Sequence, residues 1–127
     1  MKDFIITSLM LLLLFGSWLG FLYYSGQQIE SLTYDIEDNI LPAIESENWQ
    51  KSSSLMQDFQ ARWKRFQKIS LYFGSTGPLN EIDISVSRTI KYVQAEDLSN
   101  SSGELQAAKK QLSALRNQEK LNLQNIF

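Results

Sequence analysis

The sequence predicts an all-α protein, with an N-terminal transmembrane helix followed by an antiparallel four-helix bundle-like domain built from two helical hairpins. Two observations support this fold class. Residues 4–24 form one uninterrupted apolar stretch, and the rest of the chain repeats apolar residues at steps of three and four. An α-helix has about 3.6 residues per turn, so these steps place side chains on one face that can pack against other helices.

The apolar stretch runs from Phe4 to Tyr24 and contains no charged residue. At about 1.5 Å per residue it is about 30 Å long, which matches the hydrocarbon core of a bilayer. A cleaved secretory signal would need a shorter apolar core and small residues before the cleavage site. Tyr23 stands where a small residue would precede a cut after Ser25, so an uncleaved anchor is favoured.

The flanking charges favour one orientation across the membrane. Lys2 precedes the apolar stretch, and the next basic residue is Lys51, with only acidic charges between the stretch and that lysine. Short basic flanks stay in the cytoplasm. We therefore expect residues 1–25 to be a signal anchor in the cell membrane, with the N-terminus cytoplasmic, and residues 26–127 to form one extracytoplasmic domain.

The composition argues against several classes of site. The chain has no cysteine and no histidine, so it lacks a disulfide framework and the usual ligands for zinc and thiolate chemistry. A net charge of −2 argues against a nucleic-acid surface. General acid–base catalysis would depend on carboxylates alone, and these are typical of a solvated helix face. We expect no enzyme activity, no metal and no cofactor.

The first helix of the domain is predicted around residues 29–44, where apolar residues recur at three- and four-residue steps. Gly26 precedes this helix and is a candidate hinge. Pro42 lies inside the apolar pattern. Because proline has no backbone donor and clashes with the preceding turn, we expect a kink or an end near Leu41.

The second helix has the most regular pattern, at alternating steps of three and four. Its members are Trp49, Ser52, Met56, Phe59, Trp63, Phe66 and Ser70. This is the heptad seam of a packed helix, so both tryptophans are predicted to be buried. Asn48 is the expected N-cap, and the glycines and proline in residues 74–78 the stop, which gives a helix over about residues 49–73. An aromatic stripe can also form a ligand cage, but this spacing favours a core.

The third helix is predicted to begin at Asn80, with Asp83 as its capping partner, and to continue through Val93. Residues 81–86 also alternate with the period of a strand. No other segment has that period, and an isolated strand would have no partner. We therefore favour a helix.

The fourth helix repeats the spacing of the second through Leu98, Ser101, Leu105, Ala108, Leu112 and Leu115. Its start is open. Asp97 can cap it and leave Gly103 inside, at a cost of about 1 kcal/mol, or Ser101 with Glu104 can cap it and leave residues 98–100 as a loop.

The second and fourth helices match under a shift of 49 positions. The shift also places Glu47 on Glu96. It places Asn48 on Asp97. Shared heptad constraints alone could produce this match, so duplication is a hypothesis. With either origin, the short turns predict helices that pack up and down as neighbours.

Several segments carry a resemblance to a known family. They are the N-terminal span, ENW with Trp49, ARW with Trp63, EIDISVSRTIKYV, and the ending EKLNLQNIF, of which NIF is the most specific. Together they cover nearly the whole chain. The pattern resembles DUF4363, a domain of unknown function in small membrane-anchored proteins of Gram-positive, largely spore-forming bacteria. The chain departs from it at SNSSG, where the family favours alanine and glutamate. The resemblance implies the architecture and no catalytic or binding residue.

A basic cluster late in the second helix is the first candidate contact surface. It consists of Arg62, Lys64, Arg65 and Lys68. In a hairpin, this cluster would fold back beside the acidic residues of the first helix, so internal charge pairing is favoured. The alternative is contact with anionic headgroups or wall polymers, because the same geometry returns the cluster toward the bilayer.

The C-terminus is the second candidate surface, because it stays apolar through Ile126 and Phe127. It is expected either to pack across the bundle or to act as a docking tail that another membrane protein captures.

Three functional classes follow from these observations. The favoured one is a non-enzymatic module that binds or positions a partner, such as another membrane protein, at the outer membrane face, with residues 4–24 in the lipid bilayer. The second is a sensor-like bundle that binds a small ligand, and an enzyme is third. A deep pocket among the aromatic helices would favour the sensor, whereas a filled core with an exposed apolar patch would favour the partner module.

Overall fold

The computed structural model describes residues 1–73 and 77–126, without the side chains of residues 122, 123, 125 and 126. Within these ranges the chain is helical and has no strand, which confirms the all-α prediction for them. The elements are α1 (Lys2–Asp35), η1 (Ile36–Ile40), α2 (Leu41–Glu45), α3 (Trp49–Leu71), α4 (Gly77–Gln94) and α5 (Leu98–Ile126).

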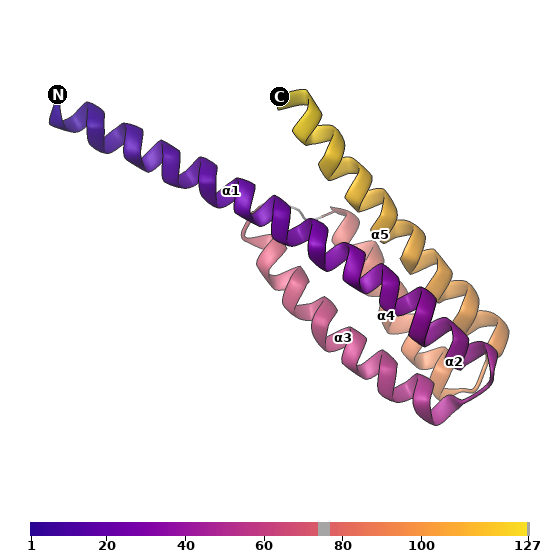
Figure 1. Cartoon of the computed structure of the whole chain (residues 1–127). Helices are drawn as coiled ribbons and strands as arrows, with labels where there is room; N and C mark the ends of the chain where they lie inside the picture. The colour runs from indigo at the N-terminus through magenta and orange to yellow at the C-terminus, as the bar shows by residue number, and fades with distance from the viewer. Residues whose placement is uncertain (74–76, 127) are drawn as a thin grey trace.

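The four long helices lie side by side, and successive helices run in opposite directions (Figure 1). α1 packs against α3 and α5, and α4 packs against the same two helices. The order around the core is therefore α1, α3, α4, α5. The N-terminal part of α1 extends beyond the others, and the end of α5 lies toward that side of the domain (Figure 1).

One hydrophobic core joins all four helices. Phe59, Trp63 and Phe66 of α3 are its largest members and are at most 1% exposed. The indole Nε1 of Trp63 donates a hydrogen bond to Asp83 Oδ1 of α4, at 3.1 Å, so the buried ring keeps its polar group satisfied. Trp49 is only partly buried, because it is the first residue of α3 and lies at the edge of the core. The prediction was right for Trp63 and wrong for Trp49.

The apolar stretch continues into the domain without a break. α1, η1 and α2 form one helix, Lys2–Glu45, which contains a segment long and apolar enough to cross a membrane. Gly26 lies inside α1, so the expected hinge at this glycine is wrong.

Pro42 disturbs this helix without ending it at Leu41. The residues before the proline form η1, a turn of π-helix, and the helix then continues to Glu45. Because proline offers no N–H to the carbonyl four residues earlier, the regular ladder fails here, and the wider π turn accommodates the failure.

The start of α4 differs from the prediction. The helix begins at Gly77, one turn before the expected start at Asn80. Pro78 therefore belongs to the first turn of α4, where its missing N–H leaves no intrahelical bond unmade. Asp83 is not a capping residue and instead contacts α3.

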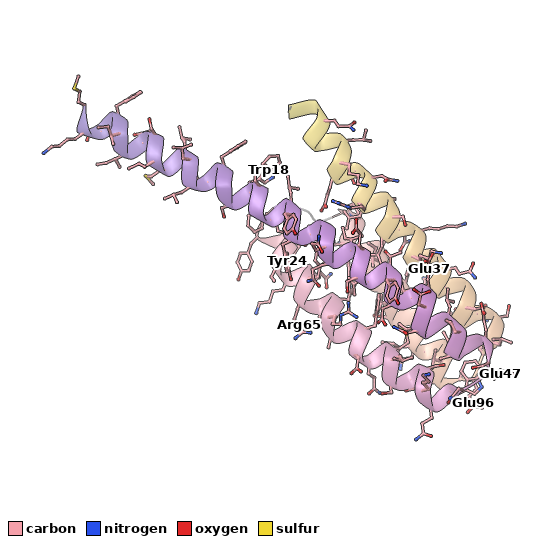
Figure 2. The ribbon with its side chains drawn as sticks, viewed as in Figure 1. Trp18, Tyr24, Glu37, Glu47, Arg65 and Glu96 are labelled. Carbon is pink, nitrogen blue, oxygen red and sulfur yellow. The ribbon has the colours of Figure 1, made fainter. Side chains whose placement is uncertain are left out.

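Two matching turns join α2 to α3 and α4 to α5. Glu47 and Glu96 both have positive φ, 58° and 54°. Asn48 then accepts a hydrogen bond from the Lys51 amide at 3.3 Å through its side chain, and Asp97 accepts one from the Asn100 amide at 3.1 Å. These two caps confirm Asn48 as the N-cap of α3 and decide the open start of α5 in favour of Asp97. Both turns lie at the end of the domain opposite the N-terminus (Figure 2).

Candidate functional site

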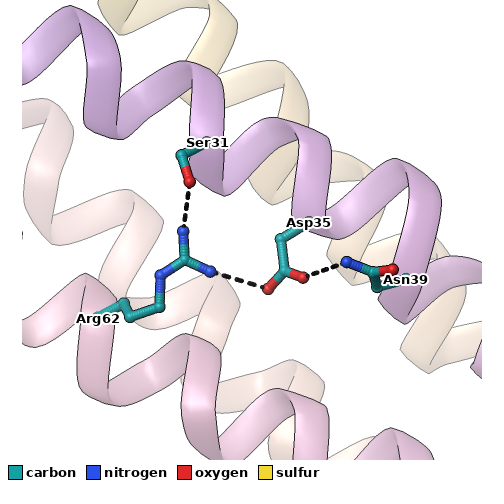
Figure 3. Close-up of polar contacts among 4 residues, drawn as sticks. All are labelled: Ser31, Asp35, Asn39 and Arg62. Carbon is teal, nitrogen blue, oxygen red and sulfur yellow. Dashed lines mark hydrogen bonds and ion pairs between the residues drawn. The ribbon is translucent and has the colours of Figure 1, made fainter.

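Arg62 of the basic cluster is tied to α1 (Figure 3). Its Nη1 donates to Asp35 Oδ2 at 3.2 Å, and its Nη2 donates to Ser31 Oγ at 2.7 Å. Asp35 in turn accepts a hydrogen bond from Asn39 Nδ2 at 2.8 Å through its other oxygen. Arg62 therefore follows the pairing interpretation of the cluster.

Lys64 pairs with a different helix. Its Nζ lies 2.7 Å from Asp83 Oδ1 of α4, the same oxygen that accepts the Trp63 indole proton. Two residues along a helix correspond to more than half a turn, so Lys64 lies on a different face of α3 from Arg62. The expectation that the whole cluster faces the first helix is therefore wrong for Lys64.

Arg65 and Lys68 are exposed and form no ion pair with another described residue. Arg65 lines a cavity of about 270 Å³ between α1 and α3, together with Tyr24 and Ile69. Figure 2 shows Arg65 on α3 beside the part of α1 that carries Tyr24. The cluster therefore divides into two paired side chains and two that are open to an external anion.

A buried polar contact between α1 and α5 has no counterpart in the sequence analysis. Ser25 Oγ donates a hydrogen bond to Glu119 Oε1 at 2.6 Å, and the two residues are 0% and 8% exposed. The second oxygen of Glu119 has no hydrogen-bond partner among the described residues. Burial raises the pKa of Glu119, and this effect is opposed by the hydrogen bond from Ser25 and by the charge of Arg116.

Gly26 lies beside this contact and leaves room for a guanidinium group. A Cβ at Gly26 would lie 2.6 Å from Cζ of Arg116, so only glycine allows the arginine to lie against α1 at this point. Arg116 Nη2 is 3.6 Å from Glu30 Oε1. Ser25 and Gly26 on α1 thus meet Arg116 and Glu119 on α5. These four residues and Glu30 are called the α1–α5 polar cluster below.

A cavity of about 280 Å³ lies beside this cluster, between α1 and α5. Its lining residues are Ile29, Glu30, Thr33, Tyr34, Glu37, Ser113, Arg116 and Asn117. Most of them are exposed or half-buried, so the cavity is a feature of the surface. The large aromatic residues of the core, Phe59, Trp63 and Phe66, do not line it. Among the described residues, no group of three or more acidic side chains could hold a metal ion.

The C-terminal candidate residues are only partly within the described structure. Ile126 is the last residue of α5. Its side chain and the whole of Phe127 lie outside the described residues. The docking tail therefore stays a prediction.

Comparison with known proteins gives one match. The family model for DUF4363, a domain of unknown function, matches residues 20–126. No curated protein and no solved structure matches the chain. The matched range includes the basic cluster and the α1–α5 polar cluster, so both belong to the part of the chain that resembles the family. Because the model covers most of the sequence, the chain belongs to the DUF4363 family.

Proposed function

We propose that this chain is a single-pass membrane protein whose helical module binds or positions a partner at the outer membrane face, without enzyme activity. In this proposal residues 4–24 of α1 cross the bilayer, the N-terminus is cytoplasmic, and the rest of the chain forms an extracytoplasmic antiparallel four-helix bundle. The favoured kind of partner is another membrane protein. The family to which the chain belongs has no assigned activity, so the proposal depends on the residues themselves.

One observation carries the proposal: the first part of the apolar stretch of α1, residues 4–15, has no protein cover. Between Phe4 and Phe15 every large hydrophobic side chain is exposed, with fractions from 44% to 76%. A continuous apolar surface of this kind would be strongly unfavourable in water. The uncharged stretch to which it belongs, residues 4–24, is about 30 Å long at about 1.5 Å per residue, which fits a bilayer. Lipid is therefore the environment that these side chains require.

The continuity of α1 supports a positioning role. The helix passes from the apolar stretch into the domain without a loop, and Arg116 fills the space at the only glycine between the stretch and η1. In this proposal the continuous helix holds the domain at one height and tilt relative to the span. Such an attachment suits a module that presents a surface to a neighbour, because it removes the freedom that a flexible linker would give.

The packing of the core favours the partner module over the ligand sensor. Phe59, Trp63 and Phe66 fill the space between the helices, and the cavities described above lie at the surface. A small-molecule site is normally a concave pocket that buries most of its ligand. The aromatic residues here contribute to folding, so the sensor is the less supported alternative.

Orientation can be tested directly, because the chain has no cysteine. Single-cysteine variants Asp3→Cys and Gln50→Cys, which both keep Lys2, should be treated with a membrane-impermeant maleimide in intact and lysed cells. We expect Gln50→Cys to react in intact cells and Asp3→Cys only after lysis. The reverse pattern would overturn the orientation, and reaction of both in intact cells would overturn the span.

The partner role calls for affinity capture of the tagged full-length chain from native membranes after crosslinking. The matched control keeps residues 20–127, so that Phe21 and Ser25 keep their contacts with the domain, and replaces residues 1–19 by an unrelated apolar segment of the same length. We expect both forms to enrich the same protein, because the module carries the binding surface. Enrichment of no protein above an unrelated single-pass protein would contradict the proposal.

A further inference from the structure

The end of α3 exposes a run of apolar side chains that the core does not use. Leu71, Tyr72 and Phe73 are 50%, 81% and 39% exposed, and Ile69 just before them is 37% exposed. We call Leu71, Tyr72 and Phe73 the α3 foot. Other exposed large hydrophobic residues beyond Tyr24 in the described chain, such as Tyr34 and Ile84, are separated along their helices. Isolated residues of that kind need no explanation, but a contiguous group marks a contact surface.

Contact with α1 fixes the depth of the α3 foot. The ring of Phe73 stacks on Phe21, with centroids 4.2 Å apart and planes within 8°. Phe21 is three residues inside the apolar stretch that ends at Tyr24, which corresponds to about 4.5 Å along a helix. The foot therefore lies at the level of the apolar stretch itself, beside its last turn.

Two other helices also carry an exposed apolar side chain near this end of the domain. On α1, Tyr23 is 73% exposed, and on α5, Leu121 is 58% exposed. One turn before the foot, α3 carries Lys68, which is exposed and has no ion pair among the described residues. Aromatic rings at the edge of an apolar zone, with an unpaired lysine just beyond it, form the arrangement that suits the interface between acyl chains and headgroups.

We propose that the α3 foot is inserted into the outer interfacial layer of the same bilayer that α1 crosses. The foot binds lipid, with Leu71 and Phe73 against acyl chains and Tyr72 at headgroup level. This inference rests on the proposed membrane span of α1. A protein occupant is less favoured, because Phe73 stacks on a residue of the apolar stretch and the foot is continuous with the surface that the span requires lipid to cover.

The test uses the full-length chain in liposomes, with one fluorophore at a single introduced cysteine and lipids that carry a quencher. Leu12→Cys reports on the span, Tyr72→Cys reports on the foot, and Tyr34→Cys is the matched control. Tyr34 is an exposed tyrosine, 63% accessible, on the part of α1 inside the domain. We expect the probe at residue 72 to be quenched by lipids labelled near the headgroup, and the probe at residue 34 to stay unquenched.

Two further outcomes separate the foot from the span. If the probe at residue 12 is quenched and the probe at residue 72 is no more quenched than the one at residue 34, the span stands and the foot proposal is overturned. This outcome includes the case in which a protein occupies the foot in cells. If residue 12 is also unquenched, the span itself fails.

A second variant tests the foot by charge. Tyr72→Asp changes a side chain that is 81% exposed, so the core should be unaffected. With the probe at Lys68→Cys, we expect shallow quenching that is lost in the Tyr72→Asp background and retained in a Tyr34→Asp background. Retention of quenching in both backgrounds would contradict insertion of the foot.

Discussion

The two hairpins have the same kind of turn but contribute different residues to the core. The first hairpin runs from residue 26 of α1 through α3, and the second consists of α4 and α5. In both turns a glutamate with positive φ precedes the N-cap, and a buried serine donates its Oγ to the carbonyl of the cap residue. These serines, Ser52 and Ser101, are 49 positions apart, as are the glutamates and the caps. The shift seen in the sequence therefore corresponds to matching local geometry at both turns.

The helices that lead into the two turns differ in the spacing of their buried residues, by one position. Five buried positions of each helix can be paired: Ile29, Leu32, Ile36, Ile40 and Ile44 in the first hairpin with Leu79, Ile82, Val86, Thr89 and Val93 in the second. The offset is 50 for the first three pairs and 49 for the last two. The change falls within η1, so the π turn takes up one extra residue and keeps the buried face in register on both sides.

The helices that leave the turns differ in what they contribute to the core. The buried α3 residues Met56, Phe59, Trp63 and Phe66 correspond to Leu105, Ala108, Leu112 and Leu115 of α5. Beyond them, Ser70 corresponds to Glu119, and each leaves a buried oxygen without a hydrogen-bond partner among the described residues. The two hairpins therefore share the turn and the heptad spacing. They differ because α3 contributes the larger buried side chains, whereas α5 contributes a buried carboxyl group, that of Glu119.

The largest expected effect tests whether the large buried side chains of α3 dominate the stability of the core. Trp63→Ala should reduce the free energy of unfolding by about 3 to 5 kcal/mol, because it removes a fully buried ring. Trp49→Ala is the matched control and should cost clearly less, since Trp49 is only partly buried. Denaturant unfolding of the full-length chain in detergent measures both. Equal losses would mean that the two rings contribute alike.

A smaller effect is expected at the shared turn. Asn48→Ala removes the side-chain acceptor for the Lys51 amide and should cost about 1 kcal/mol. Gln57→Ala, at an exposed position of the same helix, should have almost no effect. The same unfolding assay applies. A change at Asn48 as small as that at Gln57 would show that this cap does not stabilise α3.

Gly26 of α1 and Gly103 of α5 should respond differently to alanine. At Gly103 no described atom lies within 4 Å of a new Cβ, so Gly103→Ala should gain up to about 1 kcal/mol from helix propensity. Gly26→Ala displaces the guanidinium group of Arg116 and should gain less or lose stability. Thermal unfolding of the two variants compares them. Equal gains would contradict a close contact between Gly26 and Arg116.

The smallest expected effects are changes of stability with pH. The pKa values of two residues of the second hairpin are shifted in opposite directions, so their contributions to stability change with pH in opposite ways. The amide and the side chain of Asn100 donate hydrogen bonds to Asp97 and lower its pKa, so the stability it contributes is lost as pH falls through that lowered value. Burial raises the pKa of Glu119 above its ordinary value of 4.5. The folded chain then holds that proton more tightly than the unfolded chain, so stability is highest below 4.5 and declines as pH rises through the raised value.

Glu119→Gln should remove that decline, because glutamine carries no proton to lose and can still accept the hydrogen bond from Ser25. Asp97→Asn should leave the decline in stability at higher pH unchanged and should remove the loss of stability at low pH. Midpoints of thermal unfolding on both sides of pH 4.5 measure the two effects. An unchanged pH profile in Glu119→Gln would show that this carboxyl is not the group responsible.

Local signals in the sequence predicted much of the fold. The heptad positions of α3 and α5 depend only on helical periodicity, and the Asn48 cap depends on residues within one turn. The family resemblance was also confirmed. Of the two alternatives at Pro42, the disturbance is present as a π turn before the proline, and the end near Leu41 is not, because the helix continues to Glu45. The error at the start of α4 has a local cause, because Pro78 lies within the helix instead of before it.

The α1–α5 polar cluster was not predicted, because it depends on tertiary packing. Ser25 and Glu119 are 94 positions apart and meet only because α1 and α5 are neighbours. From the sequence alone, Ser25 is only the expected end of the signal anchor and Gly26 only a candidate hinge. The usable signal was the pair Arg116 and Glu119, which share one face of α5 at a spacing of three. Pairing of the basic cluster with acidic residues of the first helix was predicted and is found for Arg62 with Asp35. The pairing of Lys64 with Asp83 of α4 was not predicted.

The unbroken helix Lys2–Glu45 has a mechanical consequence if α1 spans the bilayer. From Tyr24 to the turn at Glu47 the helix extends about 35 Å beyond the span, at about 1.5 Å per residue. Spans tilt when the bilayer becomes thinner, so a tilt of about 10° would swing that distal turn sideways by about 6 Å. A helix that is stiff on both sides of the interface behaves as a lever. The turn farthest from the membrane would therefore move most when membrane thickness changes.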